Sequence, residues 1–260
     1  MQFGDLTLKQ CRHGWMLYDV TRIYVGRCLD LYGQYSEGEV RLMRNFLREG
    51  DTAIDVGANI GALTVPMSRI VGEGGLVHAI EADRETFNVL CANLALNAIR
   101  NTRPLNVLAT ARAPAIAGRA DGASSGAARV PLDSLELERC DFIKVDVDGG
   151  ELDVLRSGEM QIERFRPVLY FENEVRDQSS ALLDFVLHAL DYDLYFHPTP
   201  LFEPDNFFGN PVNHWAPTEF VSMMVLGIPR ERKLNVGLRR IASADDWWDF
   251  GIPISSYLTG

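Results

Sequence analysis

The hydrophobic residues of this chain form short continuous runs, separated by segments in which apolar residues recur at helical spacing. The continuous runs predict strands at 52–56, 76–81, 103–109, 142–145 and 168–171. The spaced segments predict helices at 60–71, 84–97 and 181–190. Because these strands do not alternate with polar residues, we expect a parallel sheet with helices on both faces. Two last strands, at 192–196 and 219–226, flank a loop rich in Pro, Phe, Asn and His and predict an antiparallel end to the sheet.

Three regions of different composition set the predicted domain boundaries. Residues 1–34 carry short β-like pieces, at 14–18 and 22–25, that are too polar to form their own core. We expect them to be a cap, followed by one α/β domain at 35–230. The aromatic tail at 231–260 is then expected to pack on that domain.

The turn that follows the strand at 52–56 predicts a site for a nucleotide cofactor. Gly57 and Gly61 stand in it, where the backbone turns sharply and a Cβ would obstruct a ligand. Glu81 ends the next apolar strand, 20 residues after Gly61. A doubly wound fold places there the carboxylate that binds the ribose hydroxyls. A glycine turn alone is often only a turn, and Glu81 favours the cofactor interpretation.

The spacing of the glycines and the charge beside them indicate which cofactor is bound. Dinucleotide dehydrogenases use Gly-x-Gly-x-x-Gly to hold a pyrophosphate, and this chain lacks that spacing. Asp55 would repel a pyrophosphate but attract an ammonium and a sulfonium, the two cations of S-adenosylmethionine. The alternatives are a non-catalytic module that binds this cofactor and an NAD(P)-dependent oxidoreductase.

Acidic and amide residues end the later strands, where a doubly wound sheet binds its ligands. Asp146 and Asp148 are two positions apart and share a face while the strand continues, so one of them is a candidate general base. Asp146 together with Glu172 and Asn173 offers oxygen ligands that suit Mg²⁺. The same residues are equally able to hydrogen-bond sugar hydroxyls without a metal.

The segment from Phe202 to Trp215 mixes aromatic rings with amides, as carbohydrate sites often do, although rings in such a segment also form core. His214 and His197 are the candidate bases if Asp146 is engaged otherwise.

The net charge and the cysteines exclude several classes of function. A formal charge of −11 argues against a nucleic-acid partner, because phosphate contacts need clustered Lys and Arg. The four cysteines form no Cys-x-x-Cys pair, which makes a zinc site or a redox dithiol improbable. We find neither a signal peptide nor an apolar run of the ~20 residues that span a bilayer, and we expect a cytoplasmic protein. The oligomeric state stays open.

Two motifs together resemble one known family. The turn from Asp55 to Gly61 and the run from Phe142 to Glu151, with Leu132-Asp133-Ser134-Leu135 before it, are similar to the FkbM-type S-adenosylmethionine-dependent methyltransferases. The resemblance covers roughly residues 33–175. It implies a class I, Rossmann-like fold with a seven-stranded, mostly parallel sheet. It also implies methyl transfer to a hydroxyl of a small molecule, often a sugar or a natural product.

The resemblance also implies where the cofactor lies. Its methionine end is expected beside Asp55, Gly57, Asn59 and Gly61, its ribose beside Glu81 and Ala82, and its adenine near Asn106. The resemblance places Tyr35, Ser36 and Glu37 over the cofactor, and Asp146 beside it. The Glu172-Asn173 pair is similar, more weakly, to the metal pair of catechol O-methyltransferases.

Overall fold

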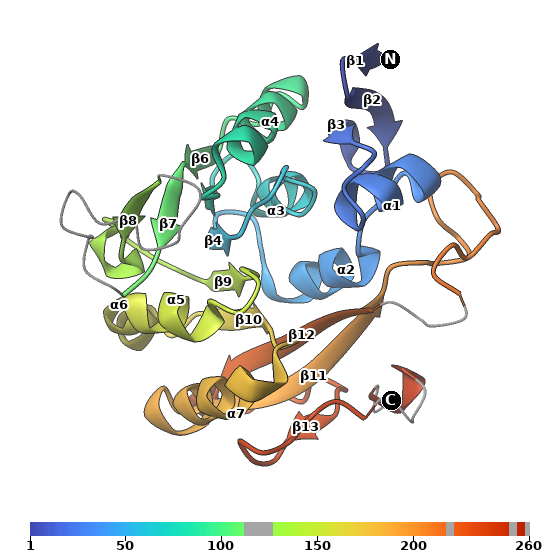
Figure 1. Ribbon diagram of the computed structural model, residues 1–260. Coiled ribbons are helices and arrows are strands. Elements are labelled where there is room, and N and C mark those ends of the chain that lie inside the picture. Colours follow the sequence, from blue (N-terminus) through green and yellow to red (C-terminus); the bar gives the residue numbers. More distant parts are fainter. Residues whose placement is uncertain (112–126, 217–220, 250–253, 258–260) are drawn as a thin grey trace.

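The computed structural model describes residues 1–111, 127–216, 221–249 and 254–257. Within these residues the centre is a sheet of eight strands, in the order β13-β11-β12-β10-β9-β4-β5-β6 (Figure 1). In chain order its strands are β4 (Thr52–Val56), β5 (Leu76–Ile80), β6 (Thr102–Leu105), β9 (Phe142–Val145), β10 (Val168–Glu172), β11 (Tyr192–Pro200), β12 (Val221–Pro229) and β13 (Arg240–Ile241).

The sheet is mostly parallel and ends in antiparallel strands, as predicted. β6, β5, β4, β9 and β10 run parallel to one another, whereas β12 is antiparallel to both β10 and β11. The described strands number eight rather than the predicted seven. The extra strand is β13, which pairs with Leu194 and Tyr195 at the edge of β11.

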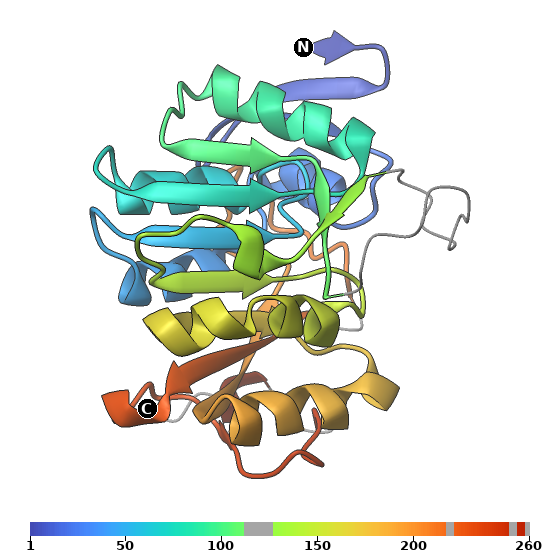
Figure 2. The same ribbon diagram turned by 90° about the vertical axis from the view of Figure 1, so that its left-hand side faces the viewer.

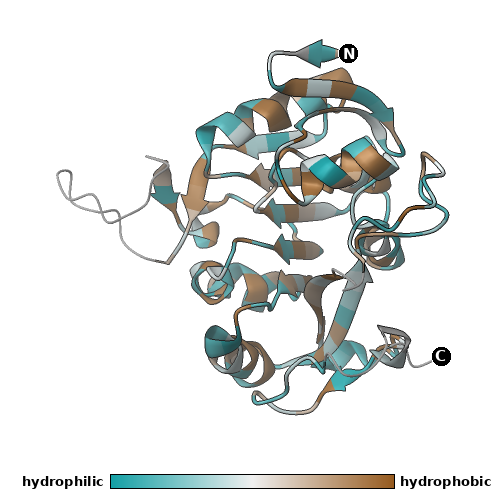
Figure 3. Ribbon diagram, turned by 45° about the vertical axis from the view of Figure 1, so that its right-hand side comes forward, coloured by the Kyte–Doolittle hydropathy of each residue, from teal (hydrophilic) through white to brown (hydrophobic). Residues whose placement is uncertain are grey.

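Helices cover both faces of the sheet. One face carries α2 (Glu37–Phe46), α3 (Thr64–Val71) and α4 (Arg84–Leu96), and the other carries α5 (Glu151–Ser157), α6 (Glu159–Phe165) and α7 (Arg176–Asp184). The helix continues after α7 as a π-helical turn, η2 (Phe185–Ala189). The structure also has three short 3₁₀ turns in its described residues: η1 (Leu132–Ser134), η3 (Arg230–Arg232) and η4 (Ile254–Tyr257). The strands lie in one stacked layer between the helices (Figure 2). Hydrophobic residues are concentrated along this layer (Figure 3).

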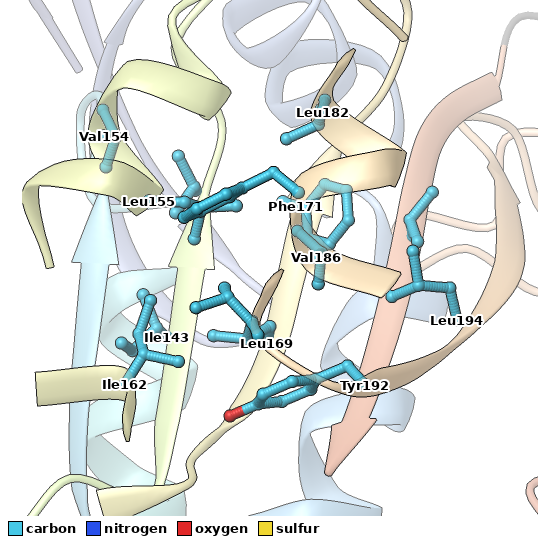
Figure 4. Packing of buried hydrophobic residues seen from close by; sticks show 14 of the residues in the cluster. Ile143, Val154, Leu155, Ile162, Leu169, Phe171, Leu182, Val186, Tyr192 and Leu194 are labelled. Carbon is cyan, nitrogen blue, oxygen red and sulfur yellow. The ribbon is translucent and has the colours of Figure 1, made fainter. Parts of the chain in front are cut away.

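Alternate residues of the central strands enter different cores. Ile143 and Leu169 pack with the helices α5 to α7 (Figure 4), whereas Phe142 and Tyr170 pack with α2 and α3. Strands that are apolar on both faces are buried on both sides, as their sequence pattern predicts. None of the helices in the described parts is long and apolar enough to cross a membrane.

The first residues form a separate antiparallel sheet of β1 (Gln2–Phe3), β2 (Leu6–Cys11) and β3 (Gly14–Asp19), followed by α1 (Val25–Tyr32). β3 packs on α4, and the side chain of Asn93 bonds both the N–H and the carbonyl of Leu17. The prediction of a β-like piece at 22–25 is wrong. Helix α1 begins at Val25 because Cys28, Leu29 and Tyr32 bury one side of it.

The predicted strand at 103–109 is divided in two. β6 ends at Leu105, and β7 (Val107–Ala109) leaves the large sheet to pair with β8 (Ala128–Val130). The chain bends at Asn106, whose side-chain amide donates to the carbonyl oxygens of Glu81 and Ala82. The predicted domain boundaries after residues 34 and 230 stay predictions. Residues 250–253 and 258–260 of the predicted tail lie outside the described residues.

Candidate functional site

A cavity of about 1360 Å³ lies at the carboxyl ends of the parallel strands. It is lined by residues that follow β4, β5, β9 and β10, and also by Tyr24, Val25 and Tyr35 of the N-terminal segment. Doubly wound sheets bind their ligands at this edge. Eight of the predicted site residues line it: Tyr35, Gly57, Asn59, Glu81, Ala82, Asp146, Asp148 and Glu172. Their individual roles stay predictions.

The glycine turn between β4 and α3 packs directly against the end of β9. Gly57 has a φ of +75°, and a Cβ on it would lie 1.8 Å from the carbonyl oxygen of Asp146. The Asp146 N–H donates to the carbonyl of Val56 at 3.1 Å. Only glycine fits this position, so the turn and Asp146 are held next to each other.

Glu81 is fixed beside this turn by two backbone groups. Its Oε2 accepts the N–H of Asn59 at 2.9 Å, and its Oε1 accepts the N–H of Asp83 at 2.8 Å. Burial raises the pKa of Glu81, and the two backbone donors oppose that shift. Each oxygen keeps a lone pair, so the carboxylate is able to accept further hydroxyl hydrogen bonds.

Asp55 lies beneath the cavity rather than in its lining. It is fully buried, and Thr64 Oγ1 donates to its Oδ2 at 2.6 Å. Its Oδ1 is 3.3 Å from the Nζ of Lys144, and the same Nζ is 3.3 Å from Oδ2 of Asp146. Burial alone lowers the pKa of Lys144, but the carboxylates of Asp146, Asp55 and Glu39 outweigh it and raise that pKa.

The sequence interpretation missed Lys144, which lines the cavity, and Glu39, which lies outside the lining but acts on the charge of Lys144. The signal of Lys144 in the sequence is a single cation inside an otherwise apolar strand. Glu39 lies on α2 with 1% of its surface exposed, and Ser36 Oγ donates to its Oε1 at 2.7 Å. Burial raises the pKa of Glu39 to about 7, although Lys144 opposes the shift.

A group of carboxylates occupies the other side of the cavity. One oxygen from each of Asp148, Glu172 and Glu174 lies within 4.8 Å of the others. Burial, followed by repulsion from Asp146 and Glu174, raises the pKa of Glu172. Burial also raises the pKa of Glu174. Within the described chain, these three residues form the acidic group that could hold a cation. The predicted metal set of Asp146, Glu172 and Asn173 shares only Glu172 with it.

The remaining predicted residues do not line the cavity: Ser36, Glu37, Asp55, Gly61, Asn106, Asn173, His197 and His214. Glu37 pairs with His13 at 2.7 Å, and Asn173 is buried with 2% exposed. His197 bonds the Tyr170 hydroxyl at 2.8 Å, and burial lowers its pKa to about 4. The backbone N–H of His214 donates to the Tyr32 hydroxyl at 3.0 Å.

The aromatic segment 202–215 packs on α1 instead of facing the cavity. The Phe202 ring is tilted against that of Tyr32, with the ring centroids 5.4 Å apart. The Asn206 side-chain amide holds its own loop by donating to the carbonyl oxygens of Glu203 and Asn210. Every residue of 202–215 is described, and none lines the cavity. Trp215 is buried and Phe202 is half-buried, as the core interpretation expects, whereas Phe207 and Phe208 are 44% and 39% exposed. These rings therefore form core only in part.

The mostly parallel sheet with antiparallel end strands and a cavity at its carboxyl edge has the fold of the class I S-adenosylmethionine-dependent methyltransferases. Residues 55–194, more than half of the chain, match the Methyltransferase FkbM domain. The chain therefore belongs to the FkbM methyltransferase family. No curated protein sequence gives a significant match.

Solved structures share the fold at low sequence identity. Methyltransferase FkbM from Methylobacillus flagellatus is 16% identical with a TM-score of 0.51, over 72% of this chain and 50% of that one. An S-adenosylmethionine-dependent O-methyltransferase from Thermotoga maritima is 14% identical with a TM-score of 0.50, over 85% and 77%. At these identities the likeness shows the fold alone.

Proposed function

We propose that this enzyme transfers a methyl group to a hydroxyl of a small molecule, such as a sugar or a natural product. The observation that carries the proposal is the position of Asp146. Its carboxylate lines the cavity beside the glycine turn, where a general base toward an acceptor hydroxyl has to lie. Both candidate histidines lie outside the cavity lining, whereas Asp146 and Asp148 both line it. Asp146 directly follows β9 and contacts the glycine turn, while Asp148 belongs to the acidic group with Glu172 and Glu174, so we take Asp146 as the base.

The residues around the turn fit S-adenosylmethionine. When bound, this cofactor supplies an electrophilic methyl group on a sulfonium. In the proposal, Gly57 and Asn59 hold its methionine end, Glu81 and Ala82 its ribose, and Tyr35 covers it. The fit rests on the donor set, because Glu81 keeps lone pairs for hydroxyls and the nearby carboxylates favour a cationic ligand.

Asp146 would accept the proton of the acceptor hydroxyl as the oxygen becomes a nucleophile. A positioned general base contributes roughly 10²–10⁴-fold to a rate. Asp146→Asn should therefore lower turnover by about that factor and change cofactor affinity only a few-fold. The test uses methyl-labelled S-adenosylmethionine with a panel of saccharides and phenols. Methylation of nitrogen or carbon instead of oxygen, or an Asp146→Asn variant as fast as the wild type, would contradict the proposal.

Glu81→Ala tests the ribose assignment. Losing a charged hydrogen-bond partner should weaken S-adenosylmethionine binding by about 1.5–3 kcal/mol. Titration calorimetry measures this change. Glu85→Ala is the matched control, because it removes an exposed carboxylate from the nearby helix α4 and should leave the affinity unaltered.

A Mg²⁺ ion is a second candidate component of the same site. The acidic group of Asp148, Glu172 and Glu174 favours it, since carboxylate oxygens are the ligands of this ion. With a bound Mg²⁺, EDTA should abolish turnover and added Mg²⁺ should restore it. Full turnover in EDTA would leave these carboxylates as hydrogen-bonding groups for the acceptor.

A further inference from the structure

Lys144 is a cation in the middle of a buried sheet. It lies on β9 directly across from Asp55 on β4, as register partners in two parallel strands. Its neighbours Ile143 and Val145 enter the core under α5 to α7, so Lys144 points to the opposite face, where α2 lies. Only 2% of its side chain is exposed. A buried charge is costly unless it is paired, so this residue needs an explanation beyond packing.

The ammonium of Lys144 is shared between two carboxylates of different exposure. The Asp55 side chain is 0% exposed and is already held by Thr64, whereas 28% of the Asp146 side chain is exposed. Pairing with Asp55 alone would neutralise the charge. The second contact links the buried Lys144–Asp55 pair to the Asp146 carboxylate in the cavity lining.

Asp146 needs such a contact to keep one orientation. Its backbone is fixed by the N–H bond to Val56 and by the close approach of Gly57. Its side chain, however, has no cation other than Lys144 within 4.0 Å in the described chain. The other ionisable groups that act on Asp146 come from the segments packed around it and are carboxyls or phenols: Tyr35, Glu39, Glu151, Tyr170, Glu172 and Glu174.

We infer that Lys144 is a positioning residue for methyl transfer, because its ammonium holds the Asp146 carboxylate in place beside the glycine turn. The inference rests on the proposed role of Asp146 as the base. A base that is out of line by about 1 Å costs up to roughly 100-fold in rate. Loss of Lys144 should therefore lower kcat while the KM of the acceptor and the affinity for S-adenosylmethionine change little.

A purely structural role is the competing explanation. Lys144 would then serve only to neutralise the buried Asp55. The variant Lys144→Met alone cannot separate the two roles, because it leaves Asp55 buried without its cation. The double variant K144M/D55N removes both buried charges together, and an Asn at position 55 is still able to accept the Thr64 hydroxyl.

The experiment compares K144M/D55N with D55N, using the saccharide or phenol that the wild type methylates best. We expect kcat to be roughly 10- to 100-fold lower in the double variant than in D55N, with cofactor affinity by calorimetry equal within about threefold. Equal kcat values in the two variants would overturn the inference. An Asp146→Asn variant with the same kcat as the wild type would instead overturn the proposed role of Asp146 as the base. The failure of the inference and the failure of the proposed function are therefore distinguishable.

A crystal structure of K144M/D55N gives a test that needs no acceptor. The inference predicts that the Asp146 carboxylate leaves its present position, whereas the backbone from Val56 to Gly57 stays. An Asp146 side chain that is unmoved and well ordered in the absence of Lys144 would overturn the positioning role.

Discussion

The buried carboxyl of Glu39 couples the stability of this protein to pH. Burial raises its pKa from 4.5 to about 7, so the folded state favours the neutral form. In the unfolded chain the group loses its proton near pH 4.5. Its contribution to stability is therefore complete below pH 4.5 and is lost as the pH rises through 7.

Replacing Glu39 by Gln should remove this pH dependence. A neutral amide keeps the bond from Ser36 and carries no charge that burial disfavours. Between pH 4.5 and 7 the unfolding free energy of the wild type should fall relative to the variant by on the order of 3 kcal/mol. Urea unfolding at several pH values measures the difference, with Glu163→Gln on the exposed side of α6 as control. Parallel pH profiles of wild type and E39Q would contradict this account.

Single residues of the site could be predicted from the sequence where their position depends only on the neighbouring sequence. Glu81 and Asp146 stand at the ends of apolar strands, and both line the cavity. Lys144 and Glu39 were missed because each interacts with residues that are distant in the sequence. Asp55 meets Lys144 through strand register, and Glu39 reaches the same group from a helix.

At the scale of elements, the turn between β4 and α3 tolerates no side chain at Gly57. An added Cβ would meet the backbone of Asp146, which cannot move without separating β4 from β9. Gly57→Ala should therefore weaken S-adenosylmethionine binding at least tenfold and lower the melting temperature. Calorimetric titration and thermal unfolding provide the two measurements.

Gly50→Ala is the matched control for this variant. Gly50 also has a positive φ, of +88°, but a Cβ there would meet nothing within 4 Å. The Gly50→Ala variant places a non-glycine residue in a left-handed conformation, which costs about 1–2 kcal/mol, but its Cβ does not collide with another atom. If the two variants bind the cofactor equally well, the collision at Gly57 is unimportant.

The strands could be predicted where the apolar runs are continuous. The predictions failed where the pairing of a strand depends on a segment distant in the sequence. β4, β5, β9 and β10 are close to their predicted bounds. β7 leaves the large sheet because it pairs with β8. No local sequence pattern predicts this pairing. β13 is two residues long and exists only through its contact with the edge of β11.

For the whole molecule, the main electrostatic feature is the excess of acid in the cavity. Its acidic lining residues are Glu81, Asp83, Asp146, Asp148, Asp153, Glu172 and Glu174, against Arg129 and Lys144 as basic ones. Lys144 is already paired with carboxylates, so it adds little attraction for an anion. The net charge of −11 acts in the same direction over the whole surface.

This distribution predicts that the acceptor is neutral or cationic. A phosphate group brought into the cavity would meet uncompensated carboxylates and would lose its hydration as well. Among matched probes, a neutral hexose or an amino sugar should therefore be methylated at least tenfold faster, in kcat/KM, than the phosphate ester of the same hexose. Added salt should narrow the difference, because it screens charges over about 10 Å at 0.1 M. A phosphate ester that is methylated as fast as the neutral sugar would show that Arg129 or another cation governs the acceptor side, and the acidic cavity would then serve the cofactor alone.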